Sequence, residues 1–151
     1  MLVQSLAPIF VEGITTIHKR QAMKIDHIGI WVKDIDKMRQ FYLTYFNTTS
    51  GEKYFNPQKK FTSYFITFNE SGCRIELMHR PDVTDNLSKR GFKMGIAHFT
   101  ISVGSKETVN TLTERFRKDG YIIEGEPRTS GDGYYESVVL DPEGNYIEIL
   151  A

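Results

Sequence analysis

Two histidine and glutamate pairs recur along this chain at almost the same spacing. Glu76 follows His27 by 49 residues (76 − 27 = 49), and Glu148 follows His98 by 50 residues (148 − 98 = 50). The glycine four residues before each glutamate and the isoleucine directly before it also coincide, at a constant offset of 72 (148 − 76 = 72). An internal repeat constrains the architecture strongly, because each copy must adopt a similar local fold. The sequence therefore predicts one structural unit that occurs twice.

Each copy begins with the pattern of a strand followed by a helix. Asp34 in the first copy and Ser105 in the second can serve as helix N-caps, and apolar residues follow them at helical spacing. Aromatic and β-branched runs bounded by Asn, Gly, Pro and Asp come next, which is typical of strands and turns. We expect these strands at 54–55, 61–68 and 73–78, and at 121–123, 134–140 and 145–150. The predicted fold class is α+β, with two tandem βαβββ units.

The repeat also sets the expected domain organisation. Residues 1–22 stand outside it as an N-terminal arm or extension, and residues 23–151 form a single domain. Within that domain we expect the first unit at 23–80, a polar linker at 81–94 and the second unit at 95–151. In the arm the apolar residues precede the positive charges, which is the reverse of the order in a signal peptide.

Charge and cysteine content exclude several classes of function. The chain has 151 residues with 19 basic and 19 acidic side chains, so no global field attracts nucleic acid or anionic lipid. The single cysteine, Cys73, excludes an intramolecular disulfide framework, and no apolar run approaches the length of a membrane span. We therefore expect a cytoplasmic protein that acts on a small molecule, with neither nucleic acid nor a membrane as partner.

Strand alternation predicts that the repeated side chains share one kind of sheet face. Side chains alternate between the two faces of a strand, and each repeated residue is flanked by an apolar residue that belongs under a helix. A lone polar residue there would point to water, but four at repeated positions beside Trp31 and Tyr146 indicate a lined cavity. Two imidazoles and two carboxylates suit one divalent ion per site, such as Ni, Co, Zn, Mn or Fe. The predicted metal ligands are His27, Glu76, His98 and Glu148, whereas His18 and His79 are expected to be ordinary surface residues.

The two predicted hairpins add candidates for the wall of this cavity. With loops of four residues in both units, antiparallel pairing would place Phe65 beside Glu76 and Ser137 beside Glu148. Arg74 shares the face of Glu76, where it could pair with a ligand carboxylate or clamp a substrate. The predicted substrate-binding residues are Trp31, Phe65, Arg74, Ser137 and Tyr146.

The duplicated unit, the paired ligand positions and the segment Asp141-Pro-Glu-Gly-Asn-Tyr-Ile-Glu148 resemble the vicinal oxygen chelate superfamily, which includes glyoxalases, bleomycin resistance proteins and dioxygenases. The resemblance covers 23–151 and is greatest to the glyoxalase I (lactoylglutathione lyase) branch. The ligand set is similar to that of bacterial glyoxalase I, whereas extradiol dioxygenases typically use two His and one Glu. In glyoxalase I a metal binds both oxygens of a hemithioacetal while a glutamate moves a proton between adjacent carbons. The resemblance implies Glu148 as the base and Glu76 as the partner acid/base.

Two positions depart from the glyoxalase I pattern. Glutathione-using members usually carry Arg four residues after the first ligand and Asn four residues after the second, where this chain has Trp31 and Arg80. The leading hypothesis is a metal-dependent glyoxalase-type lyase or isomerase that acts on a small oxygenated substrate, such as a 2-oxoaldehyde–thiol hemithioacetal. The alternatives are thiol transfer to an antibiotic, a dioxygenase reaction, or non-catalytic drug binding. A homodimer is expected, with each site built within one chain or across two.

Overall fold

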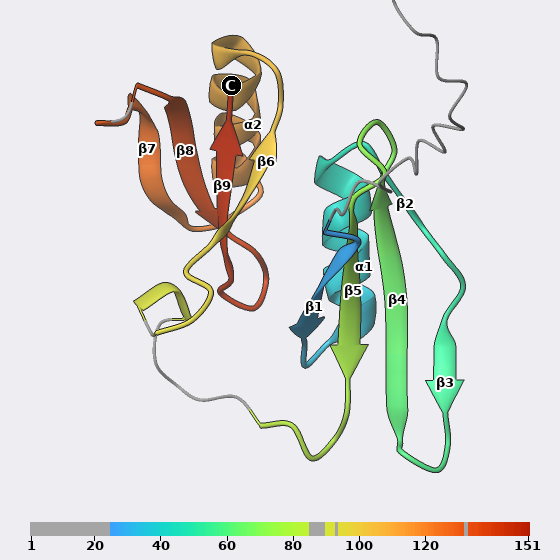
Figure 1. The fold of residues 1–151 in the computed structure, drawn as a ribbon. Helices are drawn as coiled ribbons and strands as arrows, with labels where there is room; N and C mark the ends of the chain where they lie inside the picture. Colours follow the sequence, from blue (N-terminus) through green and yellow to red (C-terminus); the bar gives the residue numbers. More distant parts are fainter. Residues whose placement is uncertain (1–24, 85–89, 93, 132) are drawn as a thin grey trace, which may run out of the picture.

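The computed structural model describes residues 25–84, 90–92, 94–131 and 133–151, so the whole predicted arm and part of the linker lie outside the described residues. The first unit contains β1 (His27–Trp31), α1 (Ile35–Tyr45), β2 (Thr48–Ser50), β3 (Tyr54–Asn56), β4 (Phe61–Phe68) and β5 (Arg74–His79) (Figure 1). The second contains β6 (Phe99–Ser102), α2 (Lys106–Lys118), β7 (Ile123–Thr129), β8 (Tyr135–Leu140) and β9 (Tyr146–Leu150). A 3-10 helix, Arg90–Phe92, lies between the units. The α+β class and the repeated unit are confirmed.

The two sheets have equivalent strand orders. The first sheet runs β1-β5-β4-β2, with β3 also paired to β4, and the second runs β6-β9-β8-β7. In each sheet the first strand pairs in parallel with the last, and the other pairs are antiparallel. The first unit therefore has one strand more than expected, because β3 covers the expected strand at 54–55 and β2 is additional. The strands β1 and β6 lie at the edges of their sheets.

The helix N-caps form as the sequence predicts, but one strand differs from its predicted position. The Asp34 side chain accepts a hydrogen bond from the Lys37 amide, and the Ser105 side chain accepts one from the Thr108 amide. The predicted strand at 121–123 is wrong, because β7 begins only at Ile123. Tyr121 instead donates its amide proton to the carbonyl of Phe116, 3.0 Å away, and packs its ring in the core. The turn that follows α2, which ends at Lys118, therefore includes residues that propensity assigns to a strand.

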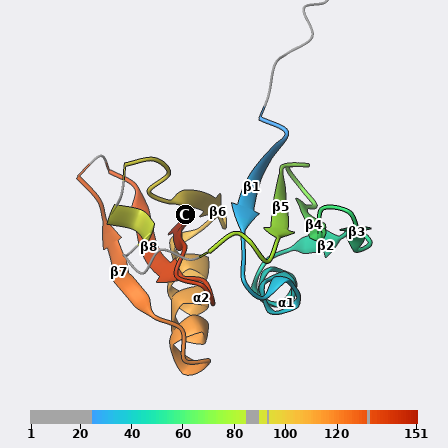
Figure 2. The same ribbon diagram turned by 90° about the horizontal axis from the view of Figure 1, so that it is seen from below.

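One hydrophobic core joins the two units. Figures 1 and 2 show both helices on the same side of the two sheets. Phe41 of α1 stacks on Phe116 of α2 with ring centroids 5.7 Å apart, and Tyr45 stacks on the same ring at 4.4 Å. Aromatic pairs of this kind add to the free energy gained from buried area. The helices thus connect the units, and the sheet faces opposite the helices remain available for a site.

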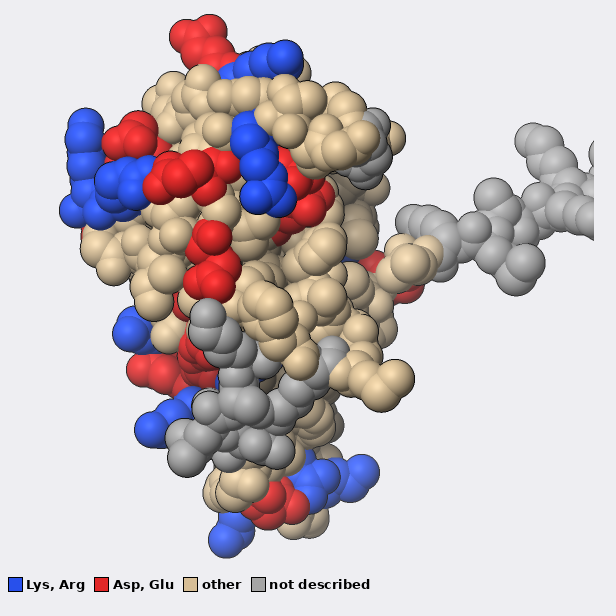
Figure 3. Space-filling model, turned by 90° about the vertical axis from the view of Figure 1, so that its left-hand side faces the viewer, with Lys and Arg blue, Asp and Glu red and all other residues tan. Residues whose placement is uncertain are grey.

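Both signs of charge are interspersed on the surface in Figure 3. Arg117 of α2 contacts both Glu114 and Glu126, and Arg128 of β7 contacts Glu136. No helix in the described ranges is long and apolar enough to cross a membrane.

Candidate metal centre

The first predicted pair, His27 and Glu76, meets on one face of the first sheet. The parallel strands β1 and β5 place Gly29 opposite Glu76. The Nε2 atom of His27 lies 3.8 Å from the Oε2 atom of Glu76, with side-chain exposures of 39% and 18%. Ile75 and Leu77, on either side of the glutamate, are buried in the core. The pair therefore lies on the face opposite α1, as alternation predicts.

The second pair, His98 and Glu148, repeats this geometry in the second sheet. The strands β6 and β9 run parallel with Thr100 opposite Glu148. The Nε2 atom of His98 lies 3.6 Å from the Oε2 atom of Glu148, with side-chain exposures of 48% and 17%. The hydroxyl of Thr100 also donates a hydrogen bond to Oε1 of Glu148 at 3.0 Å.

Both pairs have a separation that one metal ion could bridge. Histidine nitrogen and carboxylate oxygen bind zinc at about 2.0 to 2.2 Å, so two such donors on one ion are at most about 4.4 Å apart. The observed separations of 3.8 Å and 3.6 Å satisfy this limit. Each pair fits two coordination positions of a divalent ion.

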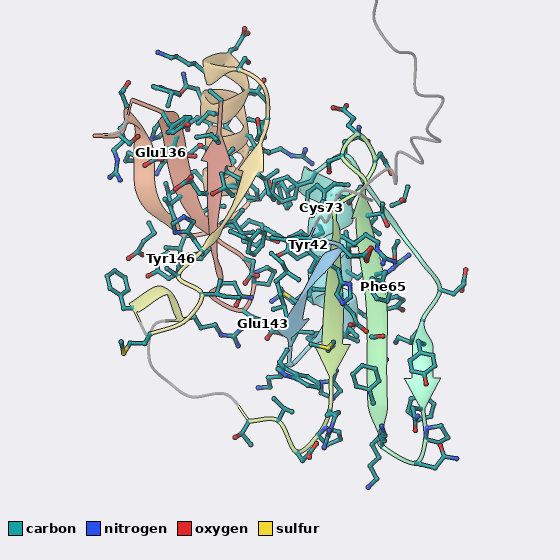
Figure 4. The ribbon with its side chains drawn as sticks, viewed as in Figure 1. Tyr42, Phe65, Cys73, Glu136, Glu143 and Tyr146 are labelled. Carbon is teal, nitrogen blue, oxygen red and sulfur yellow. The ribbon has the colours of Figure 1, made fainter. Side chains whose placement is uncertain are left out.

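The two pairs do not come together in one chain. Within the described residues, no group of three or more His, Cys, Asp or Glu side chains is close enough to hold an ion. The pairs belong to different sheets, and Figure 4 shows their neighbours Phe65 and Tyr146 in separate units. The sheets curve, but a single chain does not close them around a four-ligand cavity. The predicted cavity therefore needs a second wall.

Asp26, Arg74 and Phe65 form a connected set of contacts next to His27. The carboxylate of Asp26 forms an ion pair with Arg74, and its Oδ2 atom lies 3.3 Å from Nδ1 of His27. The hydrogen bond from Arg74, followed by the one from His27, lowers the pKa of Asp26. The Arg74 guanidinium lies over the ring of Phe65 at 4.4 Å, and this ring meets the imidazole edge-on at 5.3 Å. Arg74 is thus paired with Asp26 rather than with the predicted ligand Glu76.

The expected hairpin pairing is confirmed in the first unit and wrong in the second. Phe65 pairs with Glu76, but Ser137 pairs with Ile149, and Val138 stands beside Glu148. The hydrogen bond from the Asp141 amide to the Asn145 carbonyl makes the second loop one residue shorter than the first, which shifts the register. Ser137 is therefore only 1% exposed and lies 2.7 Å from the hydroxyl of Thr113 on α2. It faces away from the predicted metal ligands.

The remaining predicted substrate-binding residues, Trp31 and Tyr146, lie in different surroundings. Trp31 lines a cleft of about 590 Å³ together with Lys33, His79 and Arg80, and Arg80 forms an ion pair with Asp82. Tyr146 donates a hydrogen bond to Glu124 at 3.2 Å.

The histidines that the sequence assigns to the surface have different outcomes. His79 is half-buried rather than an ordinary surface residue, and its Nδ1 atom lies 2.9 Å from the Val32 carbonyl oxygen. His18 lies outside the described residues.

Sequence reasoning missed Asp26 and Thr100, the partners of the predicted ligands His27 and Glu148. Both signals were present in the sequence. Asp26 directly precedes His27, and Thr100 follows His98 by two residues, which is the spacing of side chains on one strand face.

Comparisons with known proteins agree with this fold. The family model described as Glyoxalase/Bleomycin resistance protein/Dioxygenase superfamily matches residues 24–149. A Vibrio cholerae serotype O1 protein named "Probable lactoylglutathione lyase" is 27% identical over 130 residues, which are 84% of this chain and 89% of the relative. The trypanothione-dependent glyoxalase I of Leishmania major is 26% identical, with a TM-score of 0.67 over 85% of this chain and 86% of that one. A glyoxylase/bleomycin resistance protein/dioxygenase domain from Frankia sp. EAN1pec is 16% identical, with a TM-score of 0.72 over 86% of this chain and 92% of that chain. At this identity the likeness supports the fold alone.

Proposed function

The chain belongs to the Glyoxalase/Bleomycin resistance protein/Dioxygenase superfamily, and on this premise we propose that it is a metal-dependent lyase or isomerase of the glyoxalase type. The proposed substrate is a small oxygenated molecule such as the hemithioacetal of a 2-oxoaldehyde and a thiol. The observation that carries the proposal is the duplicated pair, since both copies present a His nitrogen and a Glu oxygen within 3.8 Å of each other. One divalent ion per site, Ni, Co, Zn, Mn or Fe, suits this donor set.

The proposed reaction moves a proton between two adjacent carbons. A bound divalent ion supplies positive charge where negative charge develops on the substrate oxygens. Glu148 is the proposed base that takes the proton from the carbon next to the carbonyl, and Glu76 is the partner acid/base. His27 and His98 contribute neutral nitrogen donors and hold no proton in transit.

We propose that the working unit is a homodimer in which the first pair of one chain faces the second pair of its partner. Two observations support this arrangement. The pairs of one chain lie on separate sheets, and the strands β1 and β6 that carry the histidines are edge strands. A two-fold axis would create two equivalent sites, each with four ligands.

The thiol is proposed to differ from glutathione. Trp31 and Arg80 stand where the resemblance expects Arg and Asn, and both line the same cleft near the end of β1. The bulk of the Trp31 indole and the charge of the Arg80 guanidinium change the shape and charge that a substrate tail would meet.

A hemithioacetal isomerisation assay tests this function. Purified protein loaded separately with Ni, Co or Zn is given methylglyoxal adducts of glutathione and of several other thiols. We expect turnover of at least one adduct, weak or absent turnover of the glutathione adduct, and loss of turnover in Glu148→Gln. Failure to isomerise any adduct despite stoichiometric metal would exclude the glyoxalase reaction. Efficient use of glutathione would exclude the proposed role of Trp31 and Arg80 in selecting the thiol.

A further inference from the structure

The first half of the repeat supports its histidine. The Oδ2 atom of Asp26 lies 3.3 Å from Nδ1 of His27, while Nε2 of the same ring points to Glu76 at 3.8 Å. A carboxylate at Nδ1 favours the tautomer that carries its proton there and leaves a lone pair at Nε2 for a metal. The second half has Ala97 at the position before its histidine, so His98 has no equivalent carboxylate.

The second half supports its glutamate instead. The hydroxyl of Thr100 donates to Oε1 of Glu148 at 3.0 Å, which leaves Oε2 directed to His98. In the first half Gly29 takes the place of Thr100 opposite the glutamate. Glycine offers no hydroxyl, and neither Glu76 nor His98 has a side-chain hydrogen bond within the described part of the chain beyond its contact with the paired ligand.

The support of His27 is itself held from two neighbouring strands. Asp26 is exposed, but it forms an ion pair with Arg74 of β5, and the Arg74 guanidinium lies 4.4 Å from the ring centroid of Phe65 on β4. The Phe65 ring contacts the imidazole edge at 5.3 Å. A planar guanidinium that both pairs and stacks restricts the carboxylate more than an isolated surface ion pair does. The position of Asp26 is therefore set by packing on two strands.

We propose that Asp26 and Thr100 are positioning residues, which make His27 and Glu148 the rigid ligands of the metal and leave Glu76 and His98 adjustable. This inference rests on the proposed function, because it concerns the same metal. In the proposed dimer each site takes one supported ligand from each chain: a fixed histidine from one wall and a fixed glutamate from the other. Removal of such outer partners typically weakens metal binding by about 10- to 100-fold.

Metal affinity in the full-length protein, measured by competition with a chelator for Ni, Co or Zn, tests the proposal. We expect Asp26→Ala and Thr100→Val each to weaken binding by about 10- to 100-fold. Thr100→Ser keeps the hydroxyl and should restore the wild-type affinity. Two matched controls should leave the affinity unchanged: Asp82→Ala removes an exposed Asp from an ion pair with Arg80, and Ser102→Ala removes a hydroxyl from the same strand as Thr100.

The histidine tautomers of the metal-free protein give a second, independent result. Nitrogen-15 NMR at a pH where the rings are neutral should show His27 with its proton on Nδ1, and Asp26→Ala should shift His27, but not His98, towards the Nε2-protonated form. Wild-type metal affinity in both Asp26→Ala and Thr100→Val would overturn the inference while leaving the proposed function intact. A wild-type protein that binds no metal would instead overturn the proposed function, and an unchanged His27 tautomer in Asp26→Ala would then reject the positioning role of Asp26 as well.

Discussion

The hydroxyl of Tyr42 donates a hydrogen bond to the carboxylate of Asp141 across the boundary between the two units, over 3.2 Å. Tyr42 lies on α1 in the first unit, and Asp141 lies in the loop between β8 and β9 in the second. Both side chains are buried. Asp141 also accepts backbone hydrogen bonds from Glu143 and Asn145, so its carboxylate fixes the loop as well as the helix. Burial raises the pKa of Asp141 and raises the pKa of Tyr42 well above its usual value of 10.0.

We expect Tyr42→Phe to destabilise the protein. The change leaves the ring in the core but removes one donor from a buried carboxylate, which should lower the free energy of unfolding by about 1 to 3 kcal/mol. Urea denaturation followed by circular dichroism measures this loss. Tyr64→Phe is a matched control, because Tyr64 donates to the exposed carboxylate of Asp36. A loss in Tyr64→Phe as large as in Tyr42→Phe would contradict the importance of burial.

Stability should fall in alkaline solution because of the same tyrosine. In the unfolded chain the hydroxyl of Tyr42 ionises near pH 10.0, whereas its pKa in the folded protein is raised well above that value. Above about pH 10 the unfolded state therefore binds fewer protons than the folded state, and the free energy of unfolding decreases as pH rises. Tyr42→Phe should show a shallower decrease between pH 9 and pH 11. Equal slopes for wild type and variant would contradict the assignment.

The carboxylate of Glu143 is expected to hold the units together at a second point. It accepts hydrogen bonds from the backbone amides of Lys33 at 2.8 Å and Asp34 at 2.7 Å, at the start of α1. A negative charge at a helix N-terminus is favourable, so Glu143→Ala should lower the free energy of unfolding by about 1 to 3 kcal/mol, and Glu143→Gln by less. Thermal and urea unfolding would measure both variants. Glu114→Ala, which removes an exposed glutamate from α2, should change stability little and serves as the control.

Metal binding should depend on both pairs. We expect His98→Ala or Glu76→Ala to lower metal occupancy sharply while the fold persists, because both side chains lie on the sheet faces outside the helix-packed core. Elemental analysis of the purified variants measures occupancy, and circular dichroism reports the fold. Stoichiometric metal in either variant would reject the four-ligand site.

Mixing two inactive variants should restore part of the metal sites if each site is built across two chains. One variant carries His27→Ala with Glu76→Ala, and the other carries His98→Ala with Glu148→Ala. A heterodimer of the two would contain one intact four-ligand site, so random mixing should restore roughly one quarter of the wild-type sites. Sedimentation equilibrium should show a dimer of the 17.4 kDa chain. A metal-bound monomer, or no recovery after subunit exchange, would contradict a site shared between two chains.

Local patterns in the sequence determined the repeated unit, the helix N-caps and the face of each ligand pair. These features depend on residues close together along the chain: a cap acts on an amide three residues away, and alternation acts between neighbours in one strand. The contact of His27 with Glu76 also follows from the repeat, because the same strand pairing had to occur twice. The hydrogen bonds of Asp26 and Thr100 lie within reach of the same reasoning.

Tertiary structure alone decided the register of the last hairpin and the relative placement of the two pairs. The loop between β8 and β9 is one residue shorter than the loop between β4 and β5, so the side chain of Ser137 lies on the face that packs against α2. No local pattern in the sequence distinguishes the two loop lengths. The separation of the pairs follows from the packing of Phe41 on Phe116 and from the bond between Tyr42 and Asp141, which join segments about 75 to 100 residues apart. Such contacts depend on shape complementarity between distant surfaces. The sequence therefore predicted the two His and Glu pairs, whereas packing decided that one chain keeps these pairs apart.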